Sequence, residues 1–205
     1  MKSRLPGALL SLVLAALPAA AHADETGPVM TIRLFDTIAT WPLPPWATGP
    51  ADAARSETYR TRQKTRHGTE VFLLELIPPG ESFNSWSQLQ AIAAERPLAA
   101  PLTAHVSGIF ADFKAACIPA PTLKPLFISP EHVMILVSCP AYRNNPEQGE
   151  MMFMSLRRHD RTLVRLYYHK RGPAFRTDNP AEFPLSANEV DRLIEQHAFF
   201  RLGSP

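Results

Sequence analysis

The stretch that decides the fold is ETYRTRQKTRHGTEVFLLELI, residues Glu57–Ile77. From Arg60 to Arg66 every second residue is basic and the residues between are uncharged, a period of two that is typical of a strand with one face in solvent. From Glu70 to Ile77 the residues are mostly apolar, as in a buried strand. His67-Gly68 between the two halves favours a turn, so the stretch predicts an antiparallel β-hairpin.

Similar patterns follow along the chain. Short apolar or alternating runs bounded by Pro or polar turns predict strands over 123–128, 132–138, 150–156 and 162–170. Apolar residues at helical spacing predict a helix over 102–117, and the capping boxes Ser85-x-x-Gln88 and Ser186-x-x-Glu189 predict the starts of two more, the first of which stops at Pro97. Short turns favour antiparallel pairing. The sequence therefore predicts a single α+β domain: a mostly antiparallel sheet of about five to seven strands with about three helices packed on it.

The chain divides into three parts. Residues 1–23 have a basic start, an apolar run and the small residues Ala21-His22-Ala23, the pattern of a signal peptide cleaved near Ala23. Residues 24–56 include Trp41-Pro42-Leu43-Pro44-Pro45-Trp46, which predicts an extended Pro-rich segment pinned to the body by its tryptophans. Residues 57–205 form the α+β domain. We therefore expect a periplasmic or secreted protein.

The net charge and the hydropathy of the chain limit which partners we expect it to have. The whole chain has 21 Lys and Arg against 19 Asp and Glu, a formal charge of +2, and both Lys2 and Arg4 lie in the predicted signal peptide. The mature chain is therefore neutral, which argues against nucleic acid as a partner. Beyond the signal peptide no apolar run is long enough to cross a membrane, so we expect no transmembrane segment in the mature chain.

The two cysteines, Cys117 and Cys139, both belong to the mature chain. Two thiols in an oxidising compartment most often form one disulfide. The alternative is a redox or nucleophilic cysteine, but neither residue belongs to a Cys-x-x-Cys pair. We expect a structural disulfide between them.

Two stretches resemble a known group of proteins. They are Leu73–Trp86, with the sequence LLELIPPGESFNSW, and Arg171–Phe175 at the end of the last predicted hairpin. Together they resemble an uncharacterised family of small exported bacterial proteins, and the order of elements is similar to the α-β-α sandwich of PsbP-like and Mog1-like domains. The resemblance implies the architecture and a bacterial envelope location, and it implies no catalytic or binding residues.

One face of the last predicted strand carries a polar stripe. Its members are Arg165, Tyr167, His169 and, just beyond, Arg171. Such side chains can line a groove for a small anionic or sugar ligand. The alternative is that they form the solvent side of an antiparallel strand.

A basic row follows the first predicted strand, with Arg60, Arg62, Lys64 and Arg66 on one side of it. This row is a candidate anion-binding site. The alternative is an edge strand whose charges prevent pairing with other chains.

Two further groups of residues suggest chemistry. Glu75 lies in an apolar strand, where it is either a functional acid with a raised pKa, a partly solvated residue, or the partner of Arg60 or Arg62. Methionines and histidines suggest copper, because thioethers are ligands of Cu(I), but methionine is also ordinary core filler. The residues concerned are Met134, Met151, Met152, Met154, His132, His159 and His169.

Function follows from what these patterns contain. The sequence has no G-x-S-x-G, no H-E-x-x-H and no Gly-rich phosphate loop, and no motif that implies a cofactor. We expect an exported, non-catalytic protein that binds an envelope protein or a small anionic or sugar ligand. The alternatives are a hydrolase of envelope sugars or peptides using Glu75, Tyr167 and His169, and a periplasmic copper-binding protein.

Overall fold

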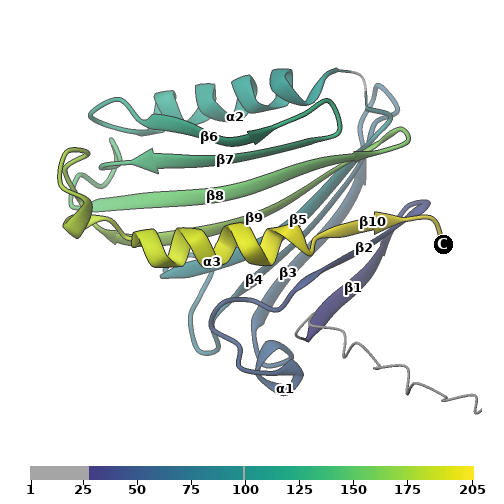
Figure 1. Cartoon of the computed structure of the whole chain (residues 1–205), viewed down its shortest axis with the longest axis horizontal. Helices are drawn as coiled ribbons and strands as arrows, with labels where there is room; N and C mark the ends of the chain where they lie inside the picture. The colour runs from purple at the N-terminus through teal and green to yellow at the C-terminus, as the bar shows by residue number, and fades with distance from the viewer. Residues whose placement is uncertain (1–27, 99) are drawn as a thin grey trace, which may run out of the picture.

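A seven-stranded antiparallel sheet is the centre of the computed structural model, which describes residues 28–98 and 100–205 (Figure 1). Its strands are β3 (Glu57–Lys64), β4 (Glu70–Ile77), β5 (Gln88–Arg96), β6 (Thr122–Ile128), β7 (His132–Cys139), β8 (Gln148–His159) and β9 (Thr162–Pro173). They lie side by side in the order β3-β4-β5-β9-β8-β7-β6. The two halves of the chain therefore meet at the pairing of β5 with β9.

Three further strands make a small second sheet. They are β1 (Val29–Leu34), β2 (Thr37–Pro42) and β10 (Arg201–Gly203), in the order β1-β2-β10. The helices are α1 (Pro50–Ala53), α2 (Leu102–Ala116) and α3 (Ala187–Ala198), with a 3-10 turn η1 (Pro180–Glu182). This architecture confirms the predicted α+β class.

The two faces of the main sheet are covered unequally. On one side, here called the α3 face, the small sheet packs over Phe72, Ile92 and Leu166, and α3 packs over Phe153 and Tyr168. On the other side, the α2 face, α2 packs against β7 and β8. α2 covers only the β7–β8 half of this face. Over most of the other half, formed by β9, β5 and β4, no helix lies among the described elements.

The hairpin predicted over Glu57–Ile77 is confirmed. β3 and β4 pair in antiparallel register, with Tyr59 opposite Glu75, and Gly68 in the turn has a φ of 82°, a conformation that glycine adopts without strain. β3 is solvent-exposed and lies at the edge of the sheet, whereas β4 is mostly buried or half-buried. The predicted strands over 123–128, 132–138, 150–156 and 162–170 and the helix over 102–117 are confirmed as well.

The helix predicted from Ser85-x-x-Gln88 to Pro97 is wrong, because this segment contains strand β5. Leu89, Ala91 and Ala93 face one side of the sheet, while Ile92 and Ala94 face the other, and all are buried. A strand buried on both faces has no polar side, so its apolar residues fit a helical pattern as well as a strand. Pairing with β4 and β9 then overrides the helix propensity of the alanines.

The predicted extended segment is more structured than its prolines suggest. Of residues 24–56 the structure describes 28–56, which contain β1, β2 and α1. The tryptophans do hold the segment to the body: Trp41 is in the core, and Trp46 packs against the cluster that contains Tyr168 and Leu193. The predicted signal peptide, residues 1–23, lies outside the described residues. In the described part of the chain no helix has the length and apolar character of a membrane span.

The capping box predicted at Ser186 and Glu189 is confirmed at the start of α3.

Near the other end of α3, His197 is fully buried against the ring of Phe153, and neither of its ring nitrogens has a partner among the described residues. Burial, together with the smaller effects of His132 and Arg157, lowers the pKa of His197 to about 3. Burial and, to a smaller extent, Arg157 lower the pKa of His132 to about 4.

We expect acid to destabilise the fold through His197. Its pKa in the folded protein lies below the ordinary value of 6.5, so its contribution is complete above pH 6.5 and is lost as the pH falls toward 3. At about pH 4.5 the loss is on the order of 2 kcal/mol relative to pH 7. His197→Leu should flatten the dependence of the unfolding free energy on pH, measured by urea denaturation. An unchanged slope would contradict this assignment.

Cys117 and Cys139 form the predicted disulfide, with a Cα–Cα distance of 5.5 Å. It joins the end of α2 to the end of β7, and both cysteines are fully buried. The bridge therefore fixes α2 to the strand on which the helix packs.

Replacing both cysteines by alanine should lower the free energy of unfolding. The bridge closes a sequence separation of 22 residues, for which loop entropy gives about 3 kcal/mol. Urea denaturation with and without a reductant measures the effect: reductant should weaken the wild-type protein and leave the double variant unchanged. Equal sensitivity of the two proteins would contradict it.

Candidate functional site

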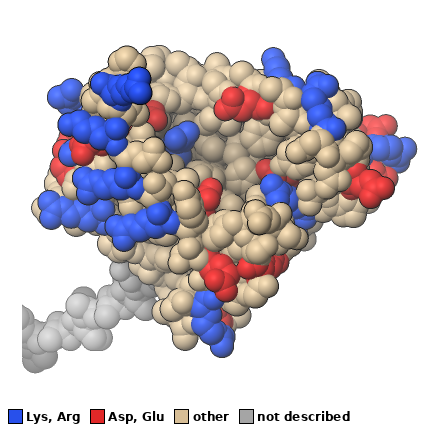
Figure 2. All heavy atoms as spheres, turned by 180° about the vertical axis from the view of Figure 1, so that it is seen from behind, with Lys and Arg blue, Asp and Glu red and all other residues tan. Residues whose placement is uncertain are grey.

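The candidate site is a hollow on the α2 face of the main sheet. Figure 2 views the molecule from the side opposite α3, and a depression lies near the middle of this surface. The face of the sheet beside α2 carries the side chains of β4, β5 and β9 at alternate positions, namely Leu73, Glu75, Ala91, Ala93, Arg165, Tyr167 and His169. The predicted polar stripe on β9 thus lies on the face of the sheet that α2 leaves partly open.

Strand register brings three of these residues into one row. Glu75 on β4 pairs with Ala91 on β5, and Ala91 pairs with Tyr167 on β9. The small alanine lies between the two larger side chains, and the negative charge of Glu75 contributes to the raised pKa of the Tyr167 hydroxyl, after the larger effect of burial. At the other end of the row, Tyr59 on β3 pairs with Glu75.

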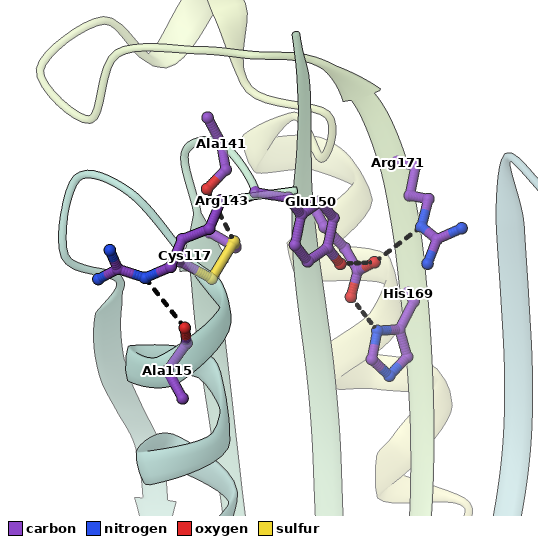
Figure 3. Close-up of a disulfide and its surroundings, with 9 residues drawn as sticks. Ala115, Cys117, Ala141, Arg143, Glu150, His169 and Arg171 are labelled. Carbon is purple, nitrogen blue, oxygen red and sulfur yellow. Dashed lines mark hydrogen bonds and ion pairs between the residues drawn. A yellow bond between two sulfur atoms is a disulfide. The ribbon is translucent and has the colours of Figure 1, made fainter. Parts of the chain in front are cut away.

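A buried carboxylate, Glu150 on β8, contacts His169 and Arg171 of the stripe (Figure 3). Its side chain is 3% exposed, and its Oε1 lies 2.5 Å from His169 Nδ1. Its Oε2 accepts hydrogen bonds from Arg171 Nε at 3.0 Å and from the Tyr142 hydroxyl. β8–β9 pairing places Glu150 opposite Arg171, and β7–β8 pairing places it opposite Cys139 of the disulfide.

The charge state of Glu150 follows from these contacts. Burial alone would raise the pKa of this carboxyl, but the charge of His169 and the hydrogen bonds from His169, Tyr142 and Arg171 outweigh burial and lower the pKa to about 2. Glu150 is therefore ionised at neutral pH. It fixes the orientation of His169 and Arg171, and among the described residues it leaves His169 Nε2 without a hydrogen-bond partner.

Aromatic rings surround this end of the hollow. The Arg171 guanidinium lies 3.5 Å from the centre of the Trp86 ring, a cation–π contact. The His169 ring meets Trp86 edge-on at 6.0 Å and Tyr167 at 5.3 Å. Trp86 lies in the loop before β5, where we expected a helix.

The arginine at the other end of the stripe also has a carboxylate partner. Arg165 Nη2 lies 3.9 Å from Glu95 Oε2, and Glu95 Oε1 lies 3.1 Å from His105 Nδ1 on α2. Both arginines of the predicted stripe therefore have an acidic partner within the protein. Their charges are less available to an anionic ligand than the sequence suggested.

Glu75 has no such partner. Among residues 28–98 and 100–205 no hydrogen bond or ion pair reaches its carboxylate, which is half-buried. Burial raises the pKa of this carboxyl, and the charge of His169 offsets part of the rise. The hypothesis that Glu75 pairs with Arg60 or Arg62 is wrong, since strand alternation places those two side chains on the opposite face.

The basic row lies away from the hollow. On β3 the Arg60 guanidinium lies 5.2 Å from the Phe72 ring centre, Arg62 Nη2 lies 3.5 Å from Glu70 Oε1, and Lys64 ends the strand, while Arg66 is in the turn. β3 is an edge strand of the main sheet, the location that the alternative explanation of these charges requires. Anion binding by this row stays a prediction.

The methionines of the copper hypothesis are buried in two different core clusters. Met152 and Met154 pack under α2, whereas Met134 and Met151 pack under α3. His132 donates to or accepts from Ser155 Oγ at 2.8 Å, far from the His169 cluster on the other face. Within the described residues no group of three His, Cys, Asp or Glu side chains is arranged to hold a metal ion. The methionines thus fit the role of core filler, and copper binding stays a prediction.

Sequence reasoning missed Glu150, Tyr142 and Trp86 as members of the site. Glu150 carries a signal that could have been used: it alternates with Met152 and Met154 on one face of a buried strand, and a buried carboxylate needs partners. Tyr142 and Trp86 lie in loops, and no local pattern marks them.

The chain matches no protein-family model, no curated protein and no solved structure, so the resemblance to PsbP-like and Mog1-like domains stays a prediction.

We expect Glu150→Gln to lower the free energy of unfolding by about 3 kcal/mol, because it removes the buried charge that Arg171 and His169 contact. The matched control is Glu131→Gln, which removes an ion pair with Arg158 whose side chains are 58% and 43% exposed. That exposed pair should contribute at most about 0.5 kcal/mol. Urea denaturation at neutral pH compares the two variants, and equal losses would contradict the role given to Glu150.

Proposed function

We propose that the protein is an exported binding protein whose ligand docks in the hollow between α2 and the β4–β5–β9 part of the sheet. The observation that carries the proposal is an incompletely covered sheet face lined by aromatic rings and oriented polar groups. Sites for small ligands are typically concave and mainly apolar, with a few fixed polar side chains. Tyr167, Trp86 and His169 provide both kinds of surface.

Preorganisation supports binding at this place. Glu150 holds His169 and Arg171, and these two in turn contact Tyr167 and Trp86. Side chains held in this way lose little conformational entropy when a ligand arrives. The contacts that stabilise the fold around Glu150 thus also hold the side chains of the site in place.

Export rests on two features of the chain. The first 23 residues have the composition of a signal peptide. The Cys117–Cys139 bridge fits an oxidising compartment such as the periplasm or the cell exterior. These features support a location in the bacterial envelope or beyond it.

A second candidate function is a hydrolase of envelope sugars or peptides. The observation that favours it is the Glu150–His169 pair, in which a carboxylate orients a histidine, as in acid–base catalysis. Tyr167 contacts that histidine at 5.3 Å between ring centres, and Glu75 lies on the same face of the sheet. In this case His169→Gln would abolish turnover, whereas in a binding protein no turnover is found.

The hollow should account for ligand binding in a fragment screen. A library of small aromatic, sugar and amine fragments, followed by amide NMR shifts, should perturb residues around Tyr167 and His169. Tyr59→Ala should weaken those fragments at least about fivefold, because Tyr59 faces the hollow and is 49% exposed, so that its loss costs little stability. Thr58→Ala, on the opposite face of the same strand, is the control. Shifts confined to the α3 face, or equal effects of the two variants, would contradict the proposal.

A further inference from the structure

Some of the charged side chains that face the hollow have a partner of opposite charge within the protein, and one does not. Arg171 and His169 contact Glu150, and Arg165 lies near Glu95, which also contacts His105. Glu75 is the carboxylate that has neither an ion pair nor a hydrogen bond in the described part of the chain. Glu75 therefore faces the hollow without a partner of opposite charge among the described residues.

The position of Glu75 is unfavourable without a ligand. Its carboxylate is half-buried, and burial without a partner disfavours the ionised form. A positive group placed beside it would remove that cost. Because Glu75 lies in the interior of β4 and not in a flexible loop, it cannot leave the hollow by a local movement of the backbone.

Aromatic residues lie on both sides of Glu75 in its cross-strand row. Tyr59 pairs with Glu75 across the β3–β4 ladder, and the Tyr59 ring contacts that of Phe83 at 5.9 Å. Tyr167 lies on the other side of Glu75, in the same row. Tyr59 and Phe83 are 49% and 36% exposed, unusually open for large aromatic side chains. Ring faces attract cations, and at Trp86 the hollow already holds the Arg171 guanidinium against such a face.

We propose that the hollow binds a small organic cation, with Glu75 as its counter-ion and Tyr59, Phe83 and Tyr167 as the aromatic walls around it. This inference rests on the proposed function and specifies its ligand class: an alkylammonium or quaternary ammonium group with an apolar surface. It replaces the anionic ligand suggested by Arg165 and Arg171. An ammonium group of this kind is stabilised by ring faces and by one carboxylate together, whereas an inorganic cation needs more oxygen ligands than Glu75 provides.

Three probes of one shape and different charge test this inference. They are choline, 3,3-dimethylbutan-1-ol and 3,3-dimethylbutanoate, which are cationic, neutral and anionic. NMR titration of the oxidised protein, residues 24–205, gives the dissociation constant of each. We expect choline to bind at least about tenfold more tightly than the alcohol, and the butanoate most weakly.

Two variants then test whether the preference for choline depends on Glu75. Glu75→Gln keeps the shape of the side chain and should remove most of the preference for choline over the alcohol. Glu195→Gln removes one charge from the exposed surface of α3 and should leave the preference unchanged. A preference that persists in Glu75→Gln overturns the role of Glu75.

The outcomes also separate this inference from the function on which it rests. Equal binding of choline and the alcohol in the wild-type protein, or tighter binding of the butanoate, overturns the cation preference and leaves the hollow as a binding site. Absence of binding by all three probes, together with a fragment screen that gives no shifts near Tyr167, overturns both. Choline shifts confined to the α3 face overturn the location.

Discussion

A single ionised carboxylate inside the sheet, that of Glu150, fixes the geometry on which the hollow depends. It connects β8 to β9 through His169 and Arg171, and to the loop after β7 through Tyr142. A charge buried at this depth is tolerated only because three donors surround it. The protein thus concentrates its polar contacts at one end of the hollow and leaves the middle to aromatic rings and Glu75.

The unequal covering of the sheet explains why the site lies where it does. The α3 face is covered by a helix and by a second sheet, so its side chains form two core clusters. On the α2 face the helix lies over β7 and β8, and the disulfide holds it there at its C-terminal end. The remaining strands on that face show half-buried polar residues where a complete core would have apolar ones.

The local sequence pattern is enough to predict helices and strands that have one solvent-exposed face and a clear turn or cap. The β3–β4 hairpin and α3 are of this kind, since each has its own periodicity and its own turn or cap. β5 was mistaken for a helix because a strand buried on both sides has no alternation to detect. The sequence predicts the stripe on β9, but the contacts of its His169 and Arg171 with Glu150 depend on the register of β8 against β9. Register of this kind is set by pairing across the whole sheet, and no short pattern encodes it.

The strand β10 has a consequence for how the chain reaches this structure. Arg201, Leu202 and Gly203 pair with Thr40, Ala39 and Ile38, so the hairpin of β1 and β2 gains its third strand from residues made far later. During synthesis the early hairpin emerges with its edge unpaired and part of its apolar surface uncovered. The small sheet is completed only after nearly all of the domain has emerged, which favours a late, cooperative closing step in folding.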